Sequence, residues 1–283
     1  MKSVFLPGED FRVDRGLATL GPEMLRLRAA VDARFVTWAE ESGAVAMAFP
    51  PLLSVNDLEA FDYFQNFPHL ALCAVPLAAQ SINDVRIEAR PLGTIDQGHL
   101  CHAQHVLPSA ACYNVYLHLR GRTIEETLYV TTAASCFRNE VEFTGLERLW
   151  GFTMREIVCI GNREAAEAHL TVFQRRISEF ATELELAITR QTATDPFYQQ
   201  QDARALMQRL APVKEEFVYG DRVAVASLNI HRNFFGERCS IRTADGGAAF
   251  TSCVAFGLER WLHALLDRYV EPAAALAALS TTA

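Results

Sequence analysis

Runs suited to β-strands alternate along this chain with long segments suited to helices, and this alternation limits the folds available to it. Val, Thr, Tyr and Phe are frequent in residues 110–116, 126–138 and 153–160. Such residues favour strands. Further strand-like runs lie at residues 44–49, 216–219, 223–228, 239–242 and 252–257. Because loops around glycines separate successive runs, we expect a mostly antiparallel sheet.

Two long segments have the apolar spacing of helices. Residues 21–43 have Pro22 near the start and Gly43 after the last apolar position, the usual places for these residues at helix ends. The second amphipathic segment runs from Asn162 to about Arg190. Another helix is expected directly after residues 252–257, whereas the tail from residue 271 is predicted to be weakly structured. The combination predicts an α+β fold.

Length and composition are those of a folded protein. With 283 residues, 50% of them apolar and 21% charged, the chain can bury a full core, and a disordered or fibrous chain is unexpected. No linker separates two domains, so we predict one domain over residues 1–283, with a helical insertion at 162–210. The net charge of −8 argues against a dedicated nucleic-acid-binding protein.

The cysteines and the hydropathy of the chain indicate in which cellular compartment the protein is expected. The seven cysteines are an odd and scattered set, and the N-terminal residues do not resemble a signal peptide. We therefore expect free thiols in the reducing cytoplasm. The longest uncharged apolar stretches, such as residues 70–79, are far shorter than the ~20 residues that span a membrane, so no membrane association is predicted.

Two arginine-glutamate clusters lie at predicted strand ends. In CFRNE, residues 136–140, Arg138 could bind a phosphate and Glu140 an amino group, while Phe152 offers a flat face to a base. In FGLER, residues 256–260, Arg260 begins a helix at a position suited to an anion. Each pattern also has a simpler interpretation, as an ion-paired hairpin or as a surface pair of Glu259 and Arg260.

Together and in order, these motifs resemble the catalytic core of class II aminoacyl-tRNA synthetases. The first helix, the following strand and Pro50-Pro51 resemble the dimer-forming motif 1, FRNE with Phe152 resembles motif 2, and AFGLERW resembles motif 3. The resemblance implies an antiparallel sheet flanked by helices, a homodimer and a bent ATP. It assigns Arg138 to the α-phosphate, Glu140 and Phe152 to adenine, and Arg260 to the γ-phosphate.

Within this class the chain resembles the amino acid:[carrier protein] ligases, truncated relatives of the zinc-dependent archaeal-type seryl enzyme. The sequence segments that carry this resemblance are SAACYNVY, CFRNE, GFTMREIVCIG, ASLNIHRNFFG and TSCVAFGLERW. It implies one Zn²⁺ per subunit held by Cys112, Glu156 and Cys253. Two thiolates and a carboxylate leave one tetrahedral position open, which a neutral substrate amine could take. The alternative is that these cysteines are only small buried apolar residues.

The resemblance assigns further residues to the ATP site, and at one position this chain departs from the pattern of the seryl branch. The seryl branch has a Mg²⁺-binding glutamate where this chain has Ala224, so Mg²⁺ is expected with ATP but its ligands are not identified. The segment from Ala224 to Ser227 is expected to line the adenosine site. Arg148 and Leu149 are assigned to the ATP site as well. Weaker candidates for polar contacts there are Lys214, Glu216 and Asn229.

The implied activity is ATP-dependent activation of a small amino acid, glycine or alanine, followed by transfer to the phosphopantetheine thiol of a small acidic carrier protein. The carrier would dock on the predicted helical insertion, at Arg175 and Arg176. Binding of tRNA is not expected, because the chain is acidic and has only about 20 residues before motif 1. A tRNA-charging seryl-type enzyme and a non-catalytic paralogue that binds an amino acid or a partner remain the alternatives.

Overall fold

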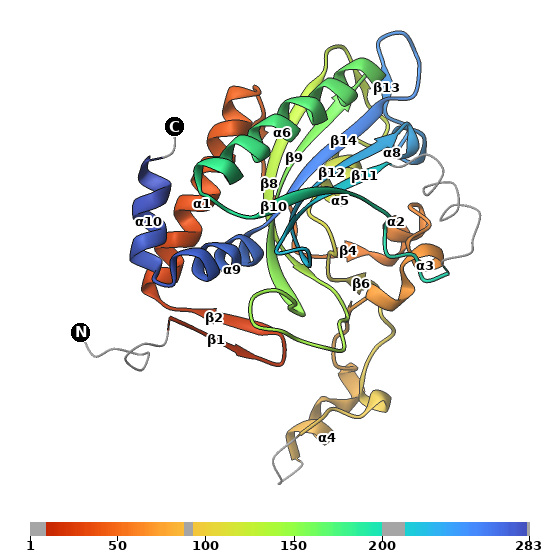
Figure 1. Ribbon diagram of the computed structural model, residues 1–283. Coiled ribbons are helices and arrows are strands. Elements are labelled where there is room, and N and C mark those ends of the chain that lie inside the picture. The colour runs from red at the N-terminus through yellow and green to blue at the C-terminus, as the bar shows by residue number, and fades with distance from the viewer. Residues whose placement is uncertain (1–9, 88–92, 200–212, 282–283) are drawn as a thin grey trace.

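A mixed β-sheet forms the centre of the protein (Figure 1). The computed structural model describes residues 10–87, 93–199 and 213–281. The strands of the central sheet in these ranges are β1 (Phe11–Asp14), β2 (Leu17–Leu20), β3 (Val45–Ala46), β8 (Leu128–Phe137), β9 (Gly151–Gly161), β10 (Ile188–Ala193), β11 (Lys214–Tyr219), β12 (Val223–Arg232) and β14 (Phe250–Gly257). Their order is β1-β2-β9-β14-β12-β11-β10, with β8 beside β9 and β3 beside β8. Only the pairs β2/β9 and β3/β8 are parallel in the described sheet.

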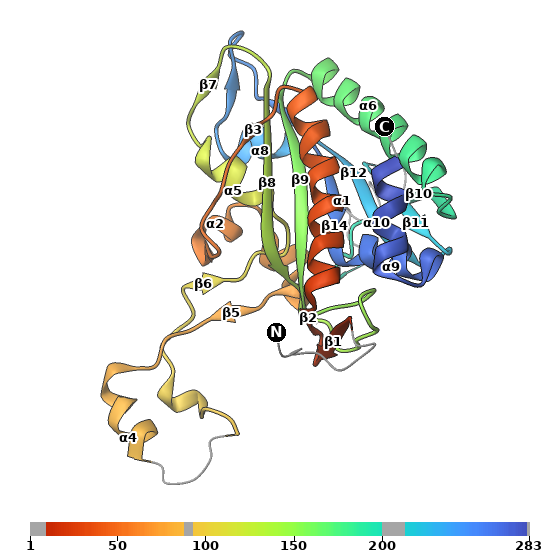
Figure 2. The same ribbon diagram turned by 90° about the vertical axis from the view of Figure 1, so that its left-hand side faces the viewer.

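One face of the sheet is covered by helices. They are α1 (Pro22–Glu41), α6 (Arg163–Glu183), α9 (Leu258–Tyr269) and α10 (Pro272–Thr281). The first three contact strands of the sheet, and α10 packs against α1 and α9 on the same side (Figure 2). This arrangement confirms the predicted α+β fold, a largely antiparallel sheet flanked by helices.

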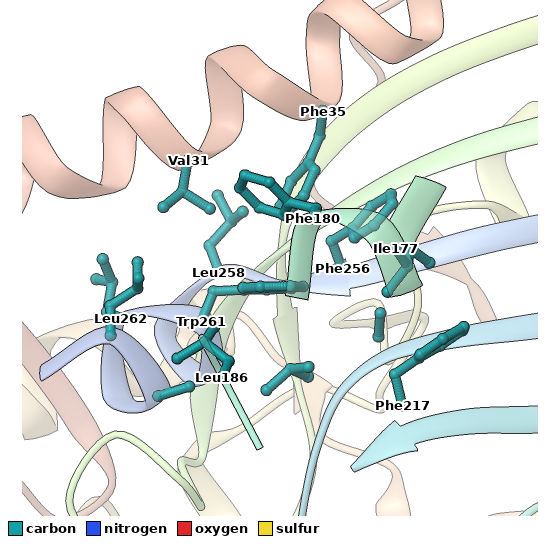
Figure 3. Packing of buried hydrophobic residues seen from close by; sticks show 14 of the residues in the cluster. Val31, Phe35, Ile177, Phe180, Leu186, Phe217, Phe256, Leu258, Trp261 and Leu262 are labelled. Carbon is teal, nitrogen blue, oxygen red and sulfur yellow. The ribbon is translucent and has the colours of Figure 1, made fainter. Parts of the chain in front are cut away.

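Aromatic side chains join this helical layer to the sheet (Figure 3). Phe35 of α1 stacks on Phe256 of β14, with ring centroids 3.9 Å apart. Phe180 of α6 and Trp261 of α9 complete the cluster, with their centroids 5.5 Å apart. All four rings are buried. Because successive strand residues point to opposite faces, the neighbours of Phe256 on β14 point away from this core.

Short elements cover the other face. They are β4 (Leu53–Ser54), α2 (Val55–Glu59), α3 (Tyr63–Asn66), η1 (Pro68–Leu70), β6 (His105–Val106), α5 (Tyr113–His118), β7 (Thr123–Ile124), α8 (Phe234–Arg238) and β13 (Arg242–Thr243). They share a second apolar cluster with the sheet. The strand β5 (Cys73–Ala74) pairs with β6, and between them an arm projects from the body (Figure 2). The arm carries η2 (Ala79–Ser81), α4 (Ile82–Ile87) and η3 (Gln97–His99).

Four local predictions were wrong in type or extent. The expected strand at 44–49 is reduced to the two residues of β3. The expected strand at 110–116 is instead a turn leading into α5, because Cys112, Val115 and Tyr116 are buried at helical spacing against the sheet. The expected strand at 239–242 is reduced to β13, since Ser240 has a left-handed φ of 53°. The tail forms α10, whose alanines and leucines favour a helix and pack on α1 and α9.

The segment 162–210, predicted as a helical insertion, is helical only in its first part. The helix α6 ends at Glu183, where Glu185 adopts a φ of 48° and the amide of Leu186 bonds back to the carbonyl of Ala181, a common helix stop. The chain then enters β10, which pairs with β11. Residues 200–210 lie outside the described residues. No helix in the described ranges is both long and apolar enough to cross a bilayer.

Candidate active site

Cys112, Glu156 and Cys253 meet on the sheet face opposite the helical core. Glu156 lies on β9 and Cys253 on the adjacent strand β14, where Cys253 is opposite Val158. Cys112 directly precedes α5. One possible ligand atom from each side chain lies within 4.8 Å of the other two. The three residues proposed from the sequence as zinc ligands are therefore neighbours in space.

The carboxylate of Glu156 has the environment of a metal ligand. Its side chain is buried, with 1% exposure. One oxygen, Oε1, accepts hydrogen bonds from the amides of Ala111 and Cys112, at 2.8 and 3.3 Å. The other, Oε2, is buried and has no hydrogen-bond partner among the described residues. A buried oxygen without a partner is costly, and a cation between the two thiols would satisfy it. The residues present thus fit a zinc ion.

The two thiols are strongly coupled. A shared hydrogen bond with Cys253, together with burial, raises the pKa of Cys112 well above its ordinary value. For Cys253 the same bond lowers the pKa, but burial and the charge of Glu156 outweigh it and raise the value to about 11. A metal would have to displace these protons, because only thiolates ligate zinc. Two thiolates and one carboxylate would leave one of four tetrahedral positions open.

A cavity of about 390 Å³ opens above this cluster, within the size range of small-molecule sites. Its walls include aromatic side chains that the sequence analysis did not select. They are Phe61, Tyr63, Phe67, Tyr113, Phe197, Phe234 and Phe235. The high density of aromatic residues in the segment 61–67 is a sequence signal from which part of this wall could have been predicted. His231 also lines this cavity, and burial lowers its pKa to about 4.

A second, adjacent cavity brings together the residues assigned to ATP. All eight line it, namely Arg138, Glu140, Arg148, Leu149, Phe152, Ala224, Ser227 and Arg260. Lys214 and Glu216 line it too, with their charged atoms 3.0 Å apart. Arg138 and Ser227 border both cavities. Asn229 does not line the second cavity: it lines the first, beside Cys253, and its contact with adenosine stays a prediction.

Of the three arginines that line the second cavity, Arg138 and Arg260 donate to backbone carbonyls. Arg260 donates from Nε to the carbonyl of Glu147 at 2.9 Å and from Nη1 to that of Ala224 at 3.0 Å. Burial and the nearby charge of Arg138 lower the pKa of Arg260 to about 10, so it remains a cation at neutral pH. Arg138 donates to the carbonyl of Ser109 at 3.3 and 3.4 Å and lies 5.2 Å from the centroid of the Phe152 ring.

The two arginines proposed for carrier docking lie elsewhere. Arg175 and Arg176 are on α6, which covers the face of the sheet opposite both cavities. Arg175 is exposed and lies 3.9 Å from Glu179, whereas Arg176 is paired with Glu41 of α1. The structure therefore does not bring them near the other predicted site residues.

Known proteins resemble this chain in both sequence and structure. It is 34% identical over 247 residues to amino acid–[acyl-carrier-protein] ligase 1 of Bradyrhizobium diazoefficiens, covering 84% of this chain and 75% of the relative. Ligase 2 of the same organism is 33% identical over 238 residues, covering 81% and 71%. The M. kandleri SerRS, solved in complex with A. aeolicus tRNASec, superposes with a TM-score of 0.80 at 21% identity. No protein-family model matches the chain.

The superposition with SerRS covers 95% of this chain but only 57% of that one, so the chain spans little more than half of that synthetase. The fold is that of a class II aminoacyl-tRNA synthetase core. At the identity and coverage of the two Bradyrhizobium ligases, the chain belongs to the amino acid–[acyl-carrier-protein] ligase family. This confirms the resemblance drawn from the motifs.

Proposed function

We propose that this protein activates a small amino acid with ATP and transfers it to the phosphopantetheine thiol of a carrier protein. The observation that carries the proposal is the junction of the two cavities: a pocket lined by the eight predicted ATP residues, three of them arginines, borders a cavity that ends on Cys112, Glu156 and Cys253. An amino acid whose amino group is bound at a metal held by these three residues would have its carboxylate directed to the pocket that contains Arg138 and Arg260.

Cys112, Glu156 and Cys253 would hold the zinc, which would supply a Lewis acid with one open position for the amino group of the substrate. The unpartnered Oε2 of Glu156 supports this assignment. A preference for amino acids over hydroxy acids would follow, because a neutral amine is a stronger donor to zinc than a hydroxyl group.

In the first half-reaction the carboxylate of the amino acid attacks the α-phosphorus of ATP and pyrophosphate leaves. Arg138 would bind the α-phosphate and Arg260 the γ-phosphate, while Glu140 and Phe152 would bind adenine. The phosphate charge would be shared with Mg²⁺. The protein positions the reactants and stabilises the charge that develops on the phosphates. The guanidinium of Arg260 is preorganised for this role, because two backbone carbonyls hold it in place.

In the second half-reaction a thiol of the carrier attacks the carbonyl carbon of the adenylate, and AMP leaves. The phosphate oxygen of the adenylate could accept the thiol proton. The docking surface on α6 stays a prediction: charge reversal at Arg175 and Arg176 should weaken carrier aminoacylation and leave adenylate formation unchanged. Equal transfer rates in the variant and wild type would contradict it.

We also propose a homodimer in the cytoplasm. The projecting arm exposes Val75, Leu77, Ile82 and Ile95 at 37–50% of their surface, and apolar side chains grouped in this way suit a protein contact. Light scattering of the purified chain measures its molar mass and so tests whether it is a dimer. The seven free thiols suit a reducing compartment.

The decisive experiment is amino-acid-dependent ATP–pyrophosphate exchange, with zinc-replete protein and each of the twenty amino acids. We expect exchange with glycine or alanine, and no exchange with any of the twenty would favour the non-catalytic alternative. Filter binding at two salt concentrations tests the tRNA-charging alternative, since phosphate contacts weaken as salt rises. Salt-sensitive binding of tRNA would support that alternative over the carrier protein.

A further inference from the structure

The two cysteines of the candidate metal site have different surroundings. Asn229 Nδ2 lies 3.5 Å from Cys253 Sγ, and His231 Nε2 lies 3.7 Å from the same sulfur. Both are distances at which an N–H can donate to a thiolate. Cys112 Sγ instead has the side chains of Cys253, Glu156 and Tyr116 as its polar neighbours, each of which is itself an acid. The pair of nitrogen donors therefore distinguishes Cys253 from Cys112.

The strand pairing places the first donor. Asn229 is directly opposite Cys253 in the β12/β14 register, so both side chains point to the cavity. Asn229 Nδ2 also lies 3.4 Å from the carbonyl of Cys253 and 3.0 Å from Ser227 Oγ. Because a carbonyl can only accept, it fixes which end of the amide is the NH₂ group. That group therefore faces the sulfur.

A β-bulge places the second donor. The register of β12 against β14 shifts between Ile230 and Arg232, which leaves His231 as the extra residue and directs its ring into the cavity, a common use of bulges at functional sites. Its Nδ1 lies 3.2 Å from Thr251 Oγ1 and 3.3 Å from the hydroxyl of Tyr116. Since a hydroxyl can donate to Nδ1, the proton of the neutral ring is assigned to Nε2, which faces Cys253.

We propose that Asn229 and His231 are positioning residues that donate two N–H hydrogen bonds to the Cys253 thiolate in the metal-bound protein. The inference rests on the proposed zinc site and deepens it. Two donors stabilise the thiolate, fix the direction of its lone pairs and reduce the charge that sulfur gives to the metal. The metal then remains the stronger Lewis acid for the substrate amine. Outer partners of this kind typically change metal affinity by about 10–100-fold.

The test is metal binding by the purified full chain. Zinc affinity of metal-free protein is measured by competition with a chromophoric chelator, and the sulfur-to-cobalt charge-transfer band is recorded after Co²⁺ loading. His231→Phe keeps a ring beside Phe235 and removes the donor, His231→Gln keeps an N–H donor, and Asn229→Leu removes the amide. Cys159→Ser is the matched control, because Cys159 is buried on the opposite face of β9.

We expect His231→Phe and Asn229→Leu each to weaken zinc binding by about 10–100-fold and to move the charge-transfer band to longer wavelength, since a thiolate without donors gives up charge more easily. His231→Gln should restore much of both, and Cys159→Ser should match wild type. An unmoved band, or equal losses in His231→Phe and His231→Gln, would overturn the inference. Wild-type protein that binds no zinc would instead overturn the metal site itself. If His231→Phe fails to fold, Asn229→Leu alone decides.

Discussion

The substitution Arg260→Lys separates charge from geometry in the cavity that holds the predicted ATP residues. Arg260 uses Nε and Nη1 to hold the carbonyls of Glu147 and Ala224. Nη2 makes no hydrogen bond to a described residue, so it is the nitrogen available to a phosphate. Lysine keeps the positive charge, but its single ammonium group cannot hold two carbonyls and a phosphate in one plane.

Two losses are expected. One carbonyl left without its donor costs about 1–3 kcal/mol of folding stability, which a denaturant titration measures. Loss of a preorganised donor to the developing charge lowers the turnover of pyrophosphate exchange by about 10²–10³-fold, or about 2.7–4 kcal/mol. Exchange must be assayed in zinc-replete protein, at a temperature where the variant is fully folded, so that the second loss is measured without the first.

Arg222→Lys is the matched control. Arg222 contacts the same loop, through the carboxylate of Glu147 at 2.6 Å, but its side chain is 67% exposed and it does not line the cavity. An exposed pair of this kind contributes little, so exchange should stay within about twofold of wild type. If Arg260→Lys retained exchange at the level of this control, preorganisation by the two carbonyls would be refuted.

Three further predictions concern the metal, the pH dependence of stability and backbone packing. Cys112→Ser or Cys253→Ser should abolish bound zinc in elemental analysis, and full zinc content in both variants would reject the ligand set. Burial lowers the pKa of His169 from 6.5 to about 4, so the unfolded chain binds more protons between these values and stability falls as pH drops through them; from pH 7 to 5 this costs about 2 kcal/mol. Urea titrations of His169→Gln, which keeps a donor, should show a pH loss smaller by that amount, and an equal loss would refute this assignment. Gly236→Ala should destabilise by about 1–3 kcal/mol or more, because a Cβ there would lie 2.1 Å from the carbonyl oxygen of Ala249, and an unchanged melting temperature would contradict this close approach.

Much of the architecture could be predicted because local pattern and tertiary packing agree. The helix at 21–43 and the strands at 126–138 and 153–160 appear as α1, β8 and β9 with small shifts of their ends. The failures occur where packing overrides local preference. Val115 and Tyr116 favour strands, but one face of the segment has to cover the sheet, and helical spacing does so. Leu279 is buried in a tail that has no clear amphipathic pattern.

The sequence by itself determined the fold class and, through its motifs, the family. It also selected eight residues that line one cavity and three that form one cluster, because each motif has a fixed spacing within a strand or at its end. Only the tertiary structure decided what surrounds them. Asn229 and His231 reach Cys253 through the pairing of β12 with β14 and a bulge in β12. Such contacts depend on the register between strands that are distant in sequence, and this register is fixed only when both strands pack one face against the core.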